Sequence, residues 1–213
     1  MHKNQFSSIV SRLVVLSGFC FCLETYRVLH TMRIRYIFLN WNLLLAWIPV
    51  LLAVLLYRES RRAKAIGYFF LWLVFFPNAP YIITDLLHLA PQDGFPFWFD
   101  AILIFSYAFT GLLMGLLSAL LVFNRVKTIT GGAAAWLLML LIMMVSGYGI
   151  YMGRFLRYNS WDIFTSPLQV LADSAHLLMH PFTNPGTCGV TLLCGALLFI
   201  VFSVFEPLLQ PFE

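Results

Sequence analysis

Residues 36–57 read YIFLNWNLLLAWIPVLLAVLLY and include no charged side chain. A membrane-spanning α-helix needs about 20 mostly apolar residues, because the hydrocarbon core of a bilayer is about 30 Å thick. A helix also satisfies its own backbone hydrogen bonds, which the water-free bilayer interior requires. We therefore predict that this stretch spans a membrane.

Further apolar stretches lie on both sides of this one. They predict additional spans at about 9–28, 65–88, 99–123, 133–153 and 187–205. Of the 213 residues, 61% are hydrophobic and 10% are charged, whereas soluble domains carry about 25% charged residues. We find no internal repeat or separate soluble domain. We expect one membrane domain over residues 1–213, an all-α polytopic transmembrane bundle of about six helices.

The first of these spans resembles a signal peptide at its start. Lys3 and Arg12 precede an apolar stretch, but no small-x-small cleavage site follows. The stretch instead continues towards Glu24 and Arg27. We therefore expect an uncleaved first span.

Charge and cysteine usage exclude two classes of function. The net charge of +4 comes from short basic clusters between apolar runs, which is typical of topology signals and not of a nucleic-acid surface. The cysteines lie inside apolar runs, where cysteine behaves as a small hydrophobic residue. Without a Cys-x-x-Cys spacing, they predict neither a disulfide scaffold nor a metal site. These residues are Cys20, Cys22, Cys188 and Cys194.

The basic residues of the loops predict the orientation. With six spans, eight Lys and Arg residues fall on one side and five on the other, and the densest cluster is the short loop 58–64. By the positive-inside rule, both termini of this multi-pass protein are cytoplasmic. The acidic residues gather mainly on the opposite, outer side, at Glu24, Asp85, Asp93, Asp100, Asp162 and Asp173.

Two local features interrupt or support the spans. Pro77-Asn78-Ala79-Pro80 breaks the third span, because two prolines remove two backbone donors. Such a break at membrane depth must be surrounded by protein or by a wet cavity, unless the helix simply ends at Phe76. Close helix packing is indicated in the fourth and fifth spans by Gly111-x-x-x-Gly115 and Gly149-x-x-x-Gly153.

Residues 166–180 predict a helix that lies in the headgroup region on the outer face. Ser166 can cap it, Pro167 suits its first turn, and Pro181 ends it. An apolar stripe faces one way and polar residues lie off it, as in interfacial helices. The stripe contains Leu168, Leu171, Ala175 and Leu178, and the polar residues are Gln169, Asp173, His176 and His180.

The densest polar cluster in an apolar context is residues 81–88. On a helix, Tyr81, Thr84, Asp85 and His88 share one face through their i+3 and i+4 spacing. Asp85 and His88 could act as an acid–base pair or bind a metal, and they could equally form a structural hydrogen bond, which we favour. With Asp100, they are the candidate catalytic residues. We predict no metal site here, nor at His176 and His180.

A second cluster, residues 153–162, follows the fifth span. Arg154 and Arg157 lie one turn apart and could clamp a phosphate, a carboxylate or a lipid headgroup. Alternatively, each could neutralise an outer aspartate such as Asp85 or Asp100, because unpaired charges near a bilayer are costly. The candidate ligand-binding residues are Asn78, Tyr81, Arg154, Arg157, Asn159 and Asp162.

Several of these stretches together resemble a known family. They are NLLLAWIP at 42–49, FFPNAPYIITDLLH at 75–88, WFD at 98–100 and GIYMGRFLRYNSWD at 149–162. They are similar to the bacterial multi-spanning membrane proteins catalogued as domain of unknown function 1361. The resemblance covers residues 36–205, so the additional span and loop at 1–35 lie outside it. The resemblance implies a location in the bacterial inner (plasma) membrane, and it implies no reaction. Many members of the family carry Tyr where this chain has Phe99.

Three functions compete on this sequence. The first is an outer-face protein that binds an anionic lipid headgroup or an envelope partner through Arg154 and Arg157. The second is a membrane enzyme acting on a lipid or envelope precursor, with Asp85 or Asp100 as base and His88 assisting. The third is a small transporter, which ranks last because only one span is broken, whereas many transporters carry two. The residues name no cofactor and no oligomeric state.

Overall fold

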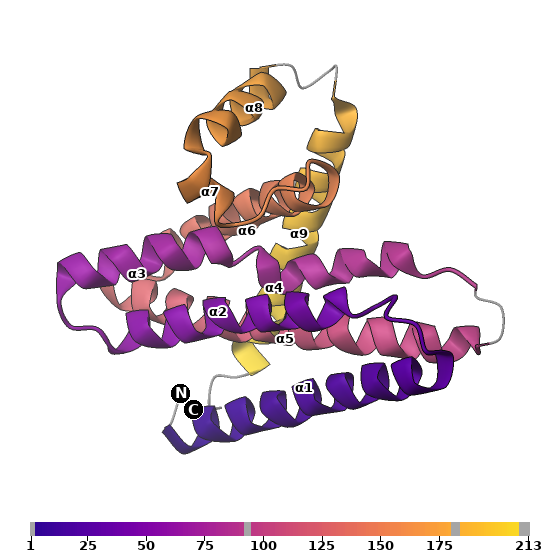
Figure 1. The fold of residues 1–213 in the computed structure, drawn as a ribbon. Coiled ribbons are helices and arrows are strands. Elements are labelled where there is room, and N and C mark those ends of the chain that lie inside the picture. Colours follow the sequence, from indigo (N-terminus) through magenta and orange to yellow (C-terminus); the bar gives the residue numbers. More distant parts are fainter. Residues whose placement is uncertain (1–2, 92–94, 180–183, 209–213) are drawn as a thin grey trace.

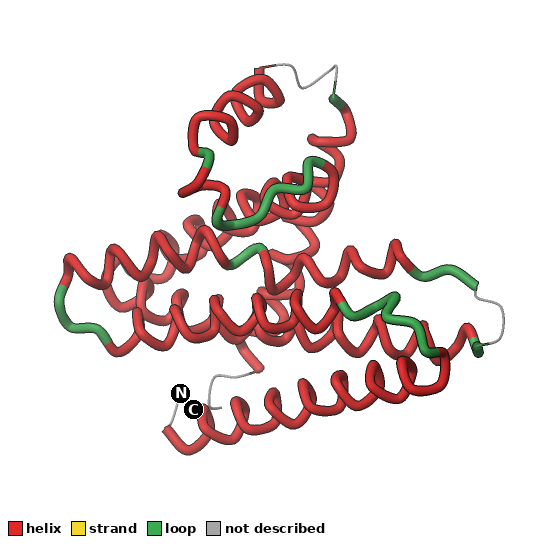
Figure 2. Tube along the Cα trace, viewed as in Figure 1, coloured by secondary structure: helices red, strands yellow, loops and turns green. Residues whose placement is uncertain are grey.

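Six helices long and apolar enough to cross a membrane are present in the computed structural model (Figure 1). The structure describes residues 3–91, 95–179 and 184–208. Within these ranges the chain is helical with connecting loops and contains no β-strand (Figure 2). The predicted all-α polytopic bundle is therefore confirmed.

The helices match the predicted spans, with several ends extended by a turn or more. The third span is divided into α3, α4 and a 3₁₀ helix, η1. The elements are α1 (Lys3–Thr31), α2 (Phe38–Arg58), α3 (Arg62–Phe75), α4 (Asn78–Tyr81), η1 (Ile82–His88), α5 (Phe97–Thr130), α6 (Gly132–Phe155), α7 (Asp162–Thr165), α8 (Pro167–Met179) and α9 (Pro185–Leu208).

The spans pack as two associated groups. Helix α2 lies against both α3 and α5, and α1 packs on α5. Helices α6 and α9 form the second group and contact each other closely. A Cβ on Gly147 would lie 2.3 Å from the carbonyl oxygen of Thr191, so the two backbones touch. Such contacts replace the hydrophobic driving force, which is absent between helices in lipid.

The two predicted packing motifs close on the broken span from opposite sides. A Cβ on Gly111 would lie 2.7 Å from the carbonyl oxygen of Ala79, and one on Gly149 would lie 2.8 Å from Cγ of Pro77. Gly153 similarly faces the ring of Tyr81. The break at Pro77 is therefore enclosed by α5 and α6, which is the protein environment that irregular backbone at membrane depth requires.

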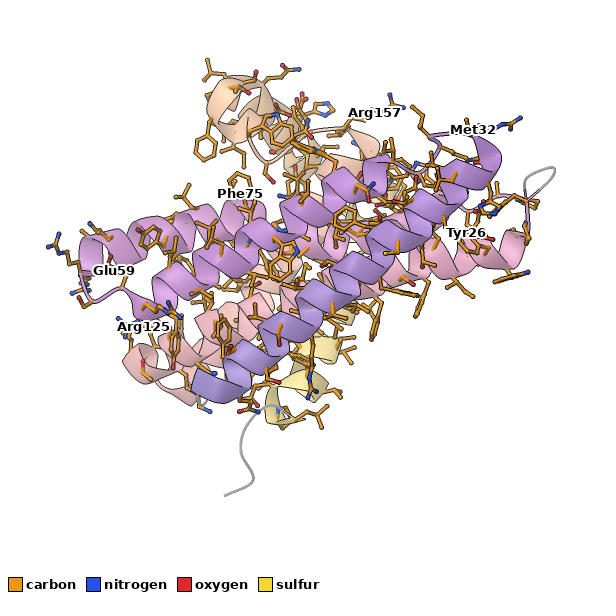
Figure 3. All side chains as sticks on the ribbon, turned by 60° about the horizontal axis from the view of Figure 1, so that its bottom comes forward. Tyr26, Met32, Glu59, Phe75, Arg125 and Arg157 are labelled. Carbon is orange, nitrogen blue, oxygen red and sulfur yellow. The ribbon has the colours of Figure 1, made fainter. Side chains whose placement is uncertain are left out.

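Side chains from the two predicted sides of the membrane lie at opposite ends of the bundle. Figure 3 shows Glu59 and Arg125 at one end and Tyr26 and Met32 at the other. At the first end, the Arg125 guanidinium donates to the carbonyl oxygen of Glu59 (3.1 Å) and joins the last turns of α5 to the loop between α2 and α3.

Helix α8 matches the predicted interfacial helix except at its end, because His180 and Pro181 lie outside the described residues. Leu168 and Leu171 of its apolar stripe are 82% and 65% exposed. These two leucines therefore face away from the protein, as expected of a helix resting in headgroups.

Candidate functional site

The site begins at the break in the third span. Helix α3 ends at Phe75, and Tyr81 donates from its backbone to the carbonyl oxygen of Pro77 (2.9 Å) to form the single turn of α4. The chain then tightens into η1. This path brings the side chains of Asn78, Tyr81 and Asp85 to the region where α2 begins and α6 ends.

Asp85 is 1% exposed and has two partners from other spans. Its Oδ1 accepts from Nη2 of Arg154 in a short ion pair. Its Oδ2 accepts from the side-chain amide of Asn42 (2.8 Å). A buried carboxylate needs this kind of complete pairing to remain charged. The ion-pair alternative considered for Arg154 is thus the observed arrangement.

The other contacts of Arg154 use its remaining donors. Its Nε donates to Oγ1 of Thr84 (2.8 Å), and its guanidinium carbon lies 4.6 Å from the centroid of the Tyr81 ring. The guanidinium also approaches Nδ1 of His88 (3.4 Å), which is itself 4.0 Å from Asp85. Arg154 is therefore held on several sides by groups of the protein itself.

Asp100 belongs to a different cluster. Its carboxylate accepts two hydrogen bonds from Arg27 of α1, at 2.6 Å from Nε and 3.1 Å from Nη2. The Arg27 guanidinium also stacks 4.4 Å from the Tyr36 ring centroid. From the sequence we expected only Arg154 or Arg157 as a partner for Asp100. A charged residue inside the first span was the available signal, because such a residue requires a partner.

A pocket of about 520 Å³ lies beside the break, between α2, α3, α4 and α6. This volume is in the range of small-molecule sites. Four of the six ligand-binding candidates line it, namely Asn78, Tyr81, Arg157 and Asn159. Arg154 and Asp162 do not, and neither do Asp85, His88 or Asp100.

The pocket has a polar end and an apolar end. Its polar end is formed by the loop after α6 and by Asn78, which exchanges hydrogen bonds with Ser160 (3.0 Å). Its apolar end reaches into the spans, where Leu45, Leu73 and Val145 line it. Trp41, Tyr148 and Ser160 also line the pocket. None of the three was a candidate from the sequence, because a single aromatic residue in a span or a single serine in a loop carries no distinct signal.

Arg157 is the one charged side chain among the described residues that line this pocket. It adopts a left-handed backbone (φ 61°) and is exposed. In the described part of the chain it has no hydrogen bond or ion pair, unlike Arg154 one turn earlier. The pocket therefore carries an uncompensated positive charge at its polar end.

Helices α7 and α8 cover one side of the pocket through Ile163, Val170 and Ser174. The hydroxyl of Tyr158 donates to Oδ2 of Asp173 on α8 (2.6 Å) and ties the cover to the loop. This hydrogen bond to a carboxylate raises the pKa of Tyr158, because ionisation would remove the donor and place two negative charges together.

Asp162 organises the loop instead of facing the pocket. Its Oδ2 accepts from the backbone N–H of Asn159 (2.7 Å), and its Oδ1 accepts from the hydroxyl of Thr165 (3.3 Å). These bonds fix the turn that presents Asn159 and Arg157.

The described residues contain no group of three or more His, Cys, Asp or Glu side chains placed to hold a metal ion. Asp85 and His88 come together without a third such ligand. His180, which the sequence analysis weighed with His176, is outside the described ranges.

Comparison with known proteins shows which of these residues lie in a region shared with a protein family. The family model described as "Protein of unknown function (DUF1361)" matches residues 41–201. The chain belongs to this family. The DUF1361 region includes the broken span, the Arg154–Asp85 pair and the whole pocket, whereas Arg27 lies before it. No curated protein and no solved structure matches the chain.

Proposed function

We propose that this protein binds an anionic amphiphile, a lipid or a lipid-linked envelope component, in the pocket beside the broken third span. The observation that supports this proposal is Arg157, the unpaired cation at the polar end of a cavity with an apolar far end. A phosphate or carboxylate headgroup would accept charge-assisted hydrogen bonds from its guanidinium.

The two ends of the pocket suit the two parts of such a ligand. Asn78, Asn159 and Ser160 offer amide and hydroxyl groups to a headgroup. Leu45, Leu73 and Val145 lie deeper along their helices and suit an acyl or prenyl chain. The exposed apolar stripe of α8 would keep the covering helices in the membrane surface, where such ligands reside.

The orientation belongs to the same proposal. The basic loop at 58–64 and the pocket lie towards opposite ends of the spans, so cytoplasmic termini in a bacterial inner membrane place the pocket on the outer leaflet. The ligand would then be a component of the outer leaflet or the envelope.

Binding accounts for the geometry better than catalysis or transport. Asp85 and Asp100 are each paired with an arginine and neither lines the pocket, so neither candidate base faces it. The deep end of the pocket is apolar, whereas a transport route needs polar groups that continue across the membrane.

The test compares lipid retention in two arginine variants. Purified wild-type protein, Arg157→Gln and Arg33→Gln would be mixed with phosphatidylglycerol, a polyprenyl phosphate or phosphatidylcholine in detergent and examined by native mass spectrometry. Arg33 is a matched control because it is also exposed and lies on the same predicted side. We expect anionic ligands to bind the wild-type and Arg33→Gln proteins, and to bind Arg157→Gln at least about tenfold more weakly.

The three ligands separate the possible sources of the anionic group. Preference for the polyprenyl phosphate indicates a lipid-linked precursor, and preference for phosphatidylglycerol indicates a bilayer lipid. Wild-type protein that retains phosphatidylcholine as strongly as the anionic lipids, or equal loss of anionic lipid in both variants, would contradict the proposal.

A further inference from the structure

Glu24 is a buried carboxyl group in the first span that has no partner. It is 2% exposed, and both Oε atoms lack a hydrogen bond among the described residues. It lies seven residues before the end of α1, about 10 Å from that end of the helix. A carboxylate left unpaired in such surroundings costs several kcal/mol.

The groups around Glu24 cannot neutralise it while the observed pairs last. On α1, Arg27 lies one turn further and gives two donors to Asp100 of α5. The other titratable groups nearby include Cys20 on α1, Tyr107 on α5 and Tyr36 before α2. Arg35 contacts the Tyr36 ring, with its guanidinium carbon 5.5 Å from the ring centroid. Cys20 contacts Thr110 (3.5 Å), and Tyr107 donates to Asn40.

The charges in this cluster balance only with one added positive charge. Glu24, Arg27 and Asp100 would together carry two negative charges and one positive charge. Taking up one proton makes the cluster neutral. Protonating a carboxylate above its ordinary pKa costs about 1.4 kcal/mol for each unit by which the pH exceeds that pKa. That cost is smaller than the cost of burying an unpaired ion.

We infer that Glu24, Arg27 and Asp100 form a proton-binding site between α1 and α5, in which Glu24 holds the proton at neutral pH. The Glu24 carboxylate takes a proton from the aqueous phase and becomes a neutral carboxylic acid, and release returns that proton to water. No other bond is made or broken.

A second unpartnered atom shows how release can be accommodated. Nη1 of Arg27 is buried and donates to no described group. After Glu24 loses its proton, this nitrogen is a donor one helical turn away. Arg27 would then serve two carboxylates instead of one, which weakens its hold on Asp100. The attachment of α1 to α5 therefore responds to proton release.

This site is independent of the proposed lipid pocket. Glu24 and Arg27 precede the family region at 41–201, and none of the three residues lines the pocket. Loss of lipid binding in Arg157→Gln would leave the proton site unaffected.

The experiment is an infrared pH titration of the full chain in lipid nanodiscs. The carbonyl stretch of a carboxylic acid is resolved from the bands of a carboxylate. Wild-type protein at pH 7 is expected to show an acid band that Glu24→Gln lacks. Glu59→Gln is the matched control, because Glu59 lies in the exposed loop and caps the backbone N–H of Arg61 (2.9 Å). It should retain the band.

Further measurements test whether the variants fold and whether sodium, instead of a proton, binds at this site. Glutamine has the shape of the protonated acid, so Glu24→Gln should melt at the wild-type temperature at pH 7. In Asp100→Asn, Arg27 is freed to pair with Glu24, and the acid band should disappear at pH 7. The inference is overturned if wild-type protein has no acid band, if the band persists in Glu24→Gln, or if sodium instead of pH controls it. A Glu24→Gln protein that melts well below the wild type also overturns it.

Discussion

Replacing Arg154 by methionine should destabilise the fold by about 3–5 kcal/mol, the range for breaking a buried ion pair from one side. The structural reason is the position of Asp85, which is 1% exposed and would keep one donor, the amide of Asn42. Methionine preserves much of the aliphatic volume of arginine, so the cost reflects the charge and not a large cavity.

A double-mutant cycle isolates this contribution. Asp85→Asn leaves the Arg154 guanidinium without its carboxylate, although Thr84 and the Tyr81 ring still contact it. We expect this variant to lose about 2–4 kcal/mol. In the double variant no unpaired charge remains, so its loss should fall short of the sum of the single losses by about 1–3 kcal/mol.

The free energies would be measured by reversible unfolding in mixed micelles, followed by tryptophan fluorescence and circular dichroism. Arg33→Met is the control for replacing an exposed arginine, and we expect a change within about 0.5 kcal/mol. Single losses that add to within about 0.5 kcal/mol in the double variant would refute a direct energetic coupling of Asp85 and Arg154.

Two other predictions concern packing and pH. Gly147→Ala places a Cβ 2.3 Å from the backbone oxygen of Thr191 and should lower the free energy of unfolding by about 1–3 kcal/mol or more. Gly132→Ala is the control, because it lies on the same helix with open space around it and should not lower that energy. Equal melting temperatures of the two variants would contradict the close α6–α9 contact. The raised pKa of Tyr158 favours its neutral form in the folded state, so its stabilising hydrogen bond to Asp173 is present below about pH 10 and is lost as pH rises further. Tyr158→Phe should therefore lower stability at neutral pH and flatten the decline above pH 10 in the melting curves, and an unchanged pH profile would argue against this bond.

The sequence by itself determined the membrane character of this protein. Hydropathy predicted all six spans, and Pro77 and Pro80 predicted where the third one breaks. These features are local, because a helix in lipid satisfies its backbone within one segment and each segment must be apolar over its own length. The packing glycines were also visible, although their shared partner, the broken segment, was not.

Only the tertiary structure decided which charged groups meet. Arg154 and Asp85 are 69 residues apart, and Arg27 and Asp100 are 73 apart. A charge in or near an apolar span needs a partner, but the sequence leaves many partners possible. The packing of the helices selects one of them. Packing buried Arg154 against Asp85, left Arg157 unpaired at the pocket and isolated Glu24 beside an arginine already engaged. The candidate chemistry of this protein thus follows from long-range pairing, which hydropathy does not encode.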